Sequence, residues 1–362
     1  MTRAVNNRVI IPERKETPLV INGDMAIAQR GTSQTGQTTN HFPVDRFGFQ
    51  MDNIGTFTSS QSTEVPTGQG FAKSLKLDCT TADASLAAGH FGFISHRFEG
   101  HNLQVLKKGT SNAEKVTISF WVKSNKTGNY VIELFDVDNT RQISQLYNIS
   151  SANTWEQKVM TFAADTTGAL GDDNGHSLAI HWVLGAGSTY SGGTLNTSWA
   201  ANNNANRWVG GPNLADSTDN EWYLTGVQLE IGDFNADTMP EFQFEDISTN
   251  LARCQRYCYQ EDNSDTYHNQ VNGFFSSSTL FIGLLALPVA LRSTPSITTS
   301  GDYETAGTGS LDASSIIVVD STGTDLTKMQ VRATVSGATA GQGAVLRNKN
   351  DADAIFRVDS EL

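Results

Sequence analysis

The sequence predicts an all-β protein, in which an N-terminal jelly-roll β-sandwich is followed by a short linking helix and a C-terminal β-sandwich. Three observations support this fold class. Glycine, serine, threonine, asparagine and aspartate are abundant. Short segments of alternating apolar and polar residues recur between turn signals, and apolar residues at helical spacing are almost absent. With 362 residues, the chain has the length of about two domains of roughly 150 residues each.

Residues 1–18 form a mixed-charge arm ahead of the first predicted domain. Pro12 and Pro18 disfavour a helix here, because proline lacks the backbone N–H that a helix needs. Two interpretations remain open for this arm. It is either a frayed terminus or a docking arm that attaches the chain to another protein.

The jelly-roll domain is expected over residues 19–245, where strand-like segments alternate with turn signals. In the segment 115–123, Val116, Ile118 and Phe120 point to one face of the strand, and Trp121 points to the other. The other predicted strands of this domain cover residues 71–79, 89–98, 129–136, 155–163, 177–184 and 222–231.

A linking helix is predicted over residues 246–259. Ser248 is the expected N-cap, because a serine hydroxyl can accept a hydrogen bond from the first free backbone N–H groups. The acidic residues Glu245 and Asp246 just ahead suit the positive end of a helix. Leu251 and Cys254 are expected to share one face with Tyr257.

The C-terminal β-sandwich is expected over residues 260–362, with strands at 271–275, 278–287, 294–299, 314–320, 329–335, 343–347 and 354–359. The stretch 274–291 is the most apolar in the chain. A strand that is apolar on both faces needs cover on both sides, and one sandwich core covers only one. The second cover is predicted to come from a partner subunit, or alternatively from a loop or the linking helix.

Charge and cysteine content exclude several classes of protein. The net charge of −13 disfavours nucleic-acid binding, which needs clustered Lys and Arg. No apolar run reaches the roughly 18 residues of a membrane span, and the N-terminus has no apolar core of signal-peptide length. Three cysteines, Cys79, Cys254 and Cys258, predict neither a disulfide framework nor a zinc site.

No motif predicts catalysis, so no catalytic residue is assigned and the protein is expected not to be an enzyme. The stretch GQGFAKS at 68–74 lacks the glycine before its lysine that a phosphate-binding loop requires. His90, His96 and His101 are close in sequence but have no completing metal ligand. Carboxylate pairs such as Asp136/Asp138 and Asp172/Asp173 leave a glycosidase acid pair as an alternative.

The long polar segment 185–221 is the main candidate for a binding site. Loops of this length are functional or disordered, and aromatic residues argue against disorder. We therefore expect a glycan-binding surface in which sugar rings stack on aromatic side chains and hydroxyls meet asparagine amides. The candidate residues are Tyr190, Trp199, Asn202, Asn204 and Trp208. Two alternatives are that the rings anchor a subunit interface and that the loop packs over its own sandwich.

Several blocks of the sequence resemble a known family. LVINGDMAIAQRGTS (19–33), VDRFGF (44–49) and WYLTGVQLEIGDF (222–234) resemble a module of bacteriophage tail-fibre proteins, with a carbohydrate-binding jelly roll of the galactose-binding-like type. The resemblance implies a structural virion component, made in the host cytoplasm. It further implies a homotrimer that contacts host-surface polysaccharide and attaches to other virion proteins through the arm. A head fibre or tail adaptor with a purely structural jelly roll is the alternative, and a glycan depolymerase is the third.

The same resemblance implies a possible structural Ca²⁺ ion, although no cofactor is required. Related sugar-binding jelly rolls often hold Ca²⁺ between the first and last strands. Here that position corresponds to Asp24, Glu230 and Asp233. Two or three carboxylates are enough, because backbone carbonyls complete the coordination of Ca²⁺. The alternative is that Asp24 caps a turn and Glu230 is solvated.

Overall fold

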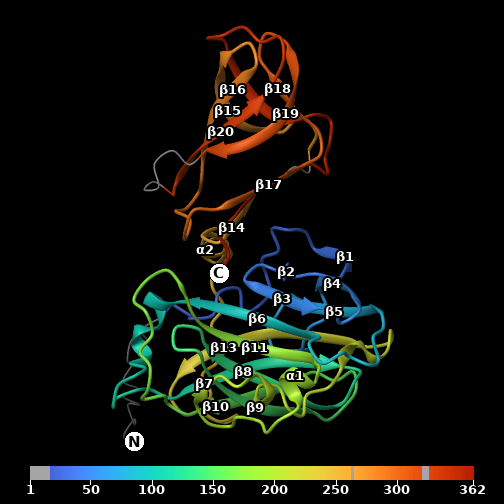
Figure 1. Ribbon diagram of the computed structural model, residues 1–362, viewed down its shortest axis with the longest axis vertical. Helices are drawn as coiled ribbons and strands as arrows, with labels where there is room; N and C mark the ends of the chain where they lie inside the picture. The colour runs from blue at the N-terminus through green and yellow to red at the C-terminus, as the bar shows by residue number, and fades with distance from the viewer. Residues whose placement is uncertain (1–16, 262–264, 320–325) are drawn as a thin grey trace, which may run out of the picture.

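The computed structural model describes residues 17–261, 265–319 and 326–362, so nearly all of the predicted arm lies outside the described residues. Two β units lie one above the other along the long axis of the molecule (Figure 1). A short helix and a small sheet lie between them. The all-β class is confirmed, because strands make up almost all of the regular structure.

The first unit is a jelly-roll sandwich of two antiparallel sheets. The six-stranded sheet has the order β1-β4-β5-β13-β7-β10, and the seven-stranded sheet has the order β12-β9-β8-β11-β6-β3-β2. The strands are β1 Ser33–Gln37, β2 His41–Val44, β3 Phe47–Asp52, β4 Thr56–Ser62, β5 Ser74–Thr81, β6 Phe91–Glu99, β7 Val116–Ser124, β8 Gly128–Asp136, β9 Arg141–Ile149, β10 Glu156–Phe162, β11 His176–Ala186, β12 Ala200–Ala201 and β13 Glu221–Ile231. Short helical turns lie in the connections, namely η1 Gly100–Leu106, α1 Ser188–Ser191, η2 Asn204–Asn206 and η3 Leu214–Asp216.

The alternation predicted for β7 is confirmed. Ile118 and Phe120 are fully buried between the two sheets, whereas Trp121 lies on the outer face and is partly exposed. The ring of Phe120 meets that of Trp182 edge to face, with centroids 5.8 Å apart. Burial of such rings between the sheets is the main driving force for this unit.

The second unit contains a closed barrel, whereas the sequence predicts a β-sandwich, which is open at its edges. Six strands form a closed barrel in the order β15-β16-β20-β19-β18-β21, and β14-β22-β17 form a separate three-stranded sheet. In a closed barrel every strand has two neighbours, so the backbone N–H and C=O groups that the edge strands of an open sheet leave unpaired find partners. The strands are β14 Cys258–Gln260, β15 Asn269–Ser277, β16 Leu280–Ala286, β17 Ser296–Ser300, β18 Tyr303–Ala306, β19 Ser310–Val319, β20 Lys328–Thr334, β21 Gly343–Asn348 and β22 Ile355–Asp359.

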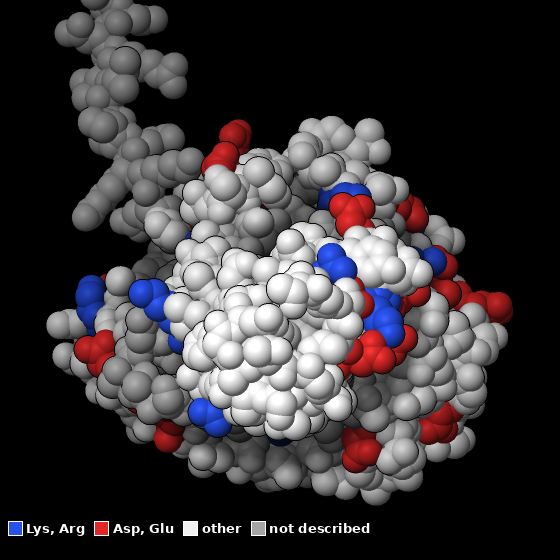
Figure 2. Space-filling view, turned by 90° about the horizontal axis from the view of Figure 1, so that it is seen from above, with Lys and Arg blue, Asp and Glu red and all other residues white. Residues whose placement is uncertain are grey.

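The apolar stretch 274–291 divides between the inside and the outside of the barrel. Phe281 and Leu285 are buried in the barrel core. Leu284 is 54% exposed and Phe274 is 48% exposed on the outer face. No loop or helix among the described residues therefore covers the outer apolar face. Seen along the long axis (Figure 2), the barrel presents a surface with few charged side chains.

The linking helix α2 spans Ile247–Gln255, and its N-cap corrects the sequence prediction. Asp246 is the N-cap, and its carboxylate accepts hydrogen bonds from the backbone N–H groups of Ser248 and Thr249. A carboxylate at this position also interacts favourably with the helix dipole. The predicted apolar face is confirmed, because Cys254 and Tyr257 pack with Ile21 and Ile27 of the sandwich. No helix in the described part of the chain has the length and apolar character to cross a membrane.

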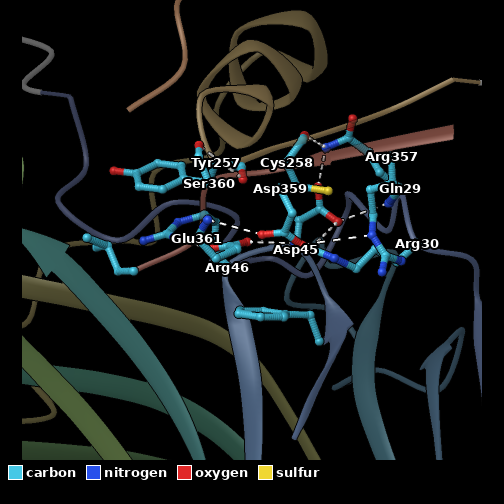
Figure 3. Close-up of polar contacts among 12 residues, drawn as sticks. Gln29, Arg30, Asp45, Arg46, Tyr257, Cys258, Arg357, Asp359, Ser360 and Glu361 are labelled. Carbon is cyan, nitrogen blue, oxygen red and sulfur yellow. Dashed lines mark hydrogen bonds and ion pairs between the residues drawn. The ribbon is translucent and has the colours of Figure 1, made fainter. Parts of the chain in front are cut away.

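A network of buried ion pairs joins the two units (Figure 3). Arg46, from the β2–β3 turn, pairs with Glu361 near the end of the sequence. The guanidinium carbon of Arg46 also lies 3.4 Å from the ring centroid of Tyr257. Arg30 lies 2.8 Å from a carboxylate oxygen of Asp359 and 3.4 Å from one of Glu361. These contacts fix the small sheet and helix α2 against the sandwich.

Candidate functional site

The structure contradicts the predicted role of Trp208 as an exposed stacking residue. Its side chain is only 1% exposed and packs with Val131 and Val183 on the outer face of the seven-stranded sheet. The ring of Tyr190 lies 4.8 Å from that of Trp208, centroid to centroid. A buried indole has no face to offer to a sugar, so the segment around Trp208 packs over its own sandwich.

A buried carboxylate holds this segment in place. Glu133 on β8 is fully buried and accepts two hydrogen bonds from Arg207, at 2.9 and 2.7 Å. It also accepts one from the indole N–H of Trp208 at 3.0 Å, and His181 Nδ1 lies 2.8 Å away. Burial by itself raises the pKa of Glu133, but Arg207 and His181 outweigh it and lower the pKa to about 2. The carboxylate of Glu133 is therefore ionised at neutral pH and is paired with Arg207 beneath the segment around Trp208.

The other predicted glycan-binding residues do not join Trp208 in one surface. Trp199 donates its indole N–H to the carbonyl of Ala163 at 2.7 Å and packs against the main core. The side-chain amide of Asn202 donates to that of Asn204 at 3.1 Å. Trp199 and Trp208 thus serve two separate packing sites within the sandwich.

The predicted calcium ligands are also not brought together. Asp24 and Glu230 both line a small pocket, and burial raises the pKa of Asp24. The side chain of Asp233 is 61% exposed and pairs instead with Lys115 at 2.7 Å. Within the described residues, no group of three or more His, Cys, Asp or Glu side chains could hold a metal ion. Asp233 thus does not join Asp24 and Glu230 at their shared pocket, and the binding of Ca²⁺ stays a prediction.

A groove on the outer face of the six-stranded sheet is the better candidate for a binding site. It has a volume of about 390 Å³. Its floor is formed by outward-facing residues of neighbouring strands, because alternate residues of a strand share one face. Trp121 on β7 is the registered partner of Gln157 on β10, and Ser119 is that of Gln228 on β13.

The wall of the groove comes from the segment that connects β13 to helix α2. Met239, Glu241, Phe242 and Phe244 of this segment line the groove. Phe242 and Phe244 pack against Phe71, with ring centroids 5.0 and 5.2 Å from it. The three rings form an aromatic rim opposite the polar floor.

A β-bulge in β13 allows the floor and the rim to meet. The register between β13 and β7 shifts between Thr225 and Gln228, and Gly226 has a φ of +61°. A Cβ atom on Gly226 would lie 2.6 Å from the Phe71 ring and 3.0 Å from the Trp121 ring. Only glycine fits here, and bulges often mark a strand next to a functional site.

The polar groups of the floor suit hydroxyl ligands. Gln157 is exposed and donates to the hydroxyl of Ser119 at 3.2 Å. Gln228 donates to Glu230 at 2.9 Å, which leaves its side-chain carbonyl as an acceptor. Among the described residues, the indole N–H of Trp121 has no hydrogen-bond partner. The groove thus combines a partly exposed ring with amide donors and acceptors.

Sequence reasoning missed this groove, although one signal was present. Trp121 lies, as predicted, on the face opposite the apolar residues of its strand, but a tryptophan in a regular strand does not by itself indicate a binding site. The residues of the wall, 236–244, follow the last strand of the sandwich and have no strand or helix pattern of their own. Their position over the sheet follows from the three-dimensional path of the chain.

Comparisons with known proteins give only distant likenesses. No protein-family model matches the sequence, and no curated protein matches it. The enzymatically active domain of tailspike protein 4 of bacteriophage CBA120 is 14% identical, with a TM-score of 0.31 over 59% of this chain and 21% of that chain. A CBM4 structure is 14% identical, with a TM-score of 0.30 over 59% of this chain and 99% of that one.

A further likeness is to the family 11 carbohydrate-binding module of a cellulosomal cellulase of Clostridium thermocellum. It is 10% identical, with a TM-score of 0.27 over 55% of this chain and 98% of that chain. With TM-scores this low, these likenesses carry no conclusion about what the present chain binds.

Proposed function

We propose that the chain is a non-enzymatic, glycan-binding component of a bacteriophage virion, most simply a trimeric tail fibre that attaches to host-surface polysaccharide. The observation that carries the glycan-binding part is the groove floored by Trp121. The flat C–H face of a sugar ring packs on an indole, and sugar hydroxyls match the amides of Gln157 and Gln228. The virion part rests on the resemblance of residues 19–33, 44–49 and 222–234 to tail-fibre modules.

Two features favour binding over hydrolysis. A glycosidase needs two carboxyl groups about 5–9 Å apart, whereas Glu241 is the one carboxylate among the residues that line the groove. Asp136, considered from the sequence for such a pair, is fully buried and paired with Lys108. The depolymerase alternative therefore lacks an acid pair at this groove.

We expect Trp121→Ala to weaken glycan binding by about 30-fold, equivalent to about 2 kcal/mol, because it removes the central ring of the groove floor. Screening on an oligosaccharide array identifies ligands, and calorimetry with the best one gives the affinity. Tyr267→Ala is the matched control, since Tyr267 is a 45% exposed aromatic residue far from the groove. Unchanged glycan binding by Trp121→Ala would contradict the proposed site.

Assembly as a homotrimer is the second part of the proposal, and the outer face of the barrel supports it. Phe274, Leu284 and Ile317 are each about half exposed on this face. The segments 266–291, 305–311 and 333–346, which build much of the barrel, contain no Lys, Arg, Asp or Glu. Arg332 lies beside Ile317 on the outer face, so this face is apolar with few charges rather than uncharged. Chains with a net charge of −13 repel each other, and a face with few charges is a favourable place for copies to meet.

We expect Leu284→Asp to raise the dissociation constant of the assembly about tenfold or more, because it would bury an unpaired charge at the contact. Analytical ultracentrifugation at micromolar concentration measures this change. Leu146→Asp is the control, because Leu146 is 42% exposed on the sandwich rather than on the barrel. A wild-type protein that sediments as a stable monomer would rule out the trimer.

The alternative is a head fibre or tail adaptor, located in the virion, whose sandwich only packs subunits together. In that case Leu284→Asp still disrupts assembly, but no glycan binds in the groove of the wild-type protein. The same two measurements therefore separate the alternatives.

A further inference from the structure

The lining of the groove is almost free of charge. Three glutamine amides and one serine hydroxyl supply its polar atoms beside Glu241, and the remaining side chains are apolar or aromatic. No Lys, Arg or His side chain is present in this lining, which comprises residues 68, 69, 71, 119, 121, 157, 226, 228, 236, 239–242 and 244. Among the described residues, the groove therefore has no cation with which to neutralise an acidic ligand.

Glu241 is exposed and available to a ligand. In the described part of the chain, its carboxylate has neither an ion-pair partner nor a hydrogen-bond donor. A carboxylate accepts hydrogen bonds from two hydroxyl groups at once, which suits neighbouring hydroxyls on one sugar ring. The same carboxylate repels a carboxylate or sulfate on the ligand.

A second pocket reinforces this negative character at one end of the groove. The pocket shares Gln228 and Phe242 with the groove, and its lining includes Asp24, Glu230 and Glu245. Arg253 lies 2.5 Å from Glu245 and neutralises that carboxylate. Glu230 receives a hydrogen bond from Gln228 but has no cation beside it among the described residues. An anionic ligand would therefore approach a region of negative potential.

From these observations we infer that the groove selects glycans without acidic groups, and that Glu241 determines this selectivity. This inference rests on the proposed glycan-binding function and adds the class of ligand. Neutral sugars satisfy the glutamines, Ser119 and Glu241 with hydroxyls alone. Sialylated, uronic-acid or sulfated sugars bring a like charge to Glu241 without a cation to offset it.

The test uses the full chain on an array of defined oligosaccharides that includes neutral, uronic-acid, sialylated and sulfated members. The variants are Glu241→Gln and Glu241→Lys, with Asp237→Lys as the matched control. Asp237 is an exposed acid of the same connecting segment that does not line the groove, so its replacement changes the net charge equally. Trp121→Ala shows whether any binding observed depends on the groove.

We expect the wild-type protein to bind neutral glycans only, with an affinity that is unchanged between low and high salt. Glu241→Lys should raise the ratio of acidic to neutral binding about tenfold or more. Glu241→Gln should raise it less, and Asp237→Lys should leave it unchanged.

The failures of the two proposals are distinguishable. Wild-type binding of acidic glycans that is lost in Trp121→Ala would overturn the selectivity and leave the glycan-binding function intact. An equal gain of acidic binding in Asp237→Lys and Glu241→Lys would overturn the role of Glu241. Binding that does not depend on Trp121, or no binding to any glycan on the array, would overturn both.

Discussion

Replacing Glu133 with alanine is expected to destabilise the protein by about 3–5 kcal/mol, the usual cost of breaking a buried ion pair by removing one partner. The substitution leaves the guanidinium of Arg207 and the indole N–H of Trp208 without their acceptor under the packed segment. Both donors are then desolvated without compensation. The loss of stability is measured by urea unfolding at neutral pH.

Glu114→Ala is the control for this experiment. Glu114 pairs with Lys107 at the surface, where both side chains are well exposed, and such pairs contribute about 0–1 kcal/mol. Similar losses of stability in the two variants would mean that the buried cluster does not hold the segment. Hydrogen exchange then localises the effect, because the backbone N–H of Trp208, bonded to the carbonyl of Tyr190, should lose protection in Glu133→Ala.

The carboxylate of Glu133 should also make the stability of the folded protein depend on pH, and the direction of this dependence follows from its pKa. Its pKa in the folded protein is about 2, below the usual value of 4.5. Its contribution to stability is therefore complete above about pH 4.5 and is lost as the pH falls toward 2. We expect the wild-type protein to lose about 3 kcal/mol more than Glu133→Gln between pH 5 and pH 2. Parallel stability profiles for the two proteins would contradict this assignment.

Local patterns predicted much of the fold. The alternation in 115–123 matches β7, and the segments 177–184 and 222–231 lie within β11 and β13. Such patterns tell which residues face the core, but they do not tell which strands pair. The closure of the barrel depends on the pairing of β15 with both β16 and β21. The pairing of β15 with β16 is a local hairpin, but its pairing with β21 is non-local, so the sequence pattern left open how the second unit closes.

The site was harder to predict than the fold, for a physical reason. A tryptophan in a polar loop suggests exposure, but Trp208 is buried by an interaction with Glu133, 75 residues away. Conversely, Trp121 in a regular strand suggests a structural role, but a bulge and a distant connecting segment leave it at the base of a groove. In both cases the decisive contact lies far along the chain.

The junction between the two units carries the last prediction. Arg46 is 2% exposed, pairs with Glu361, donates to the carbonyl of Arg97 at 2.7 Å and stacks on Tyr257. It thus connects the sandwich to helix α2 and to the end of the small sheet. Among the described residues, Glu361 would keep an ion pair with Arg30 at 3.4 Å after Arg46 is removed. The stability lost when Arg46 is replaced is therefore lost at the contact between the two units and not inside either hydrophobic core.

We expect Arg46→Ala to destabilise the junction by about 3–5 kcal/mol, because it removes a buried charge partner and the packing of its side chain on Tyr257. Each unit has its own hydrophobic core, so each can remain folded when the contact weakens. Calorimetry should then resolve two transitions where the wild-type protein shows a single one. Lys115→Ala, which breaks an exposed pair with Asp233, should keep the wild-type behaviour. A single unshifted transition in Arg46→Ala would show that the apolar contacts of Cys254 and Tyr257 with the sandwich suffice to couple the units.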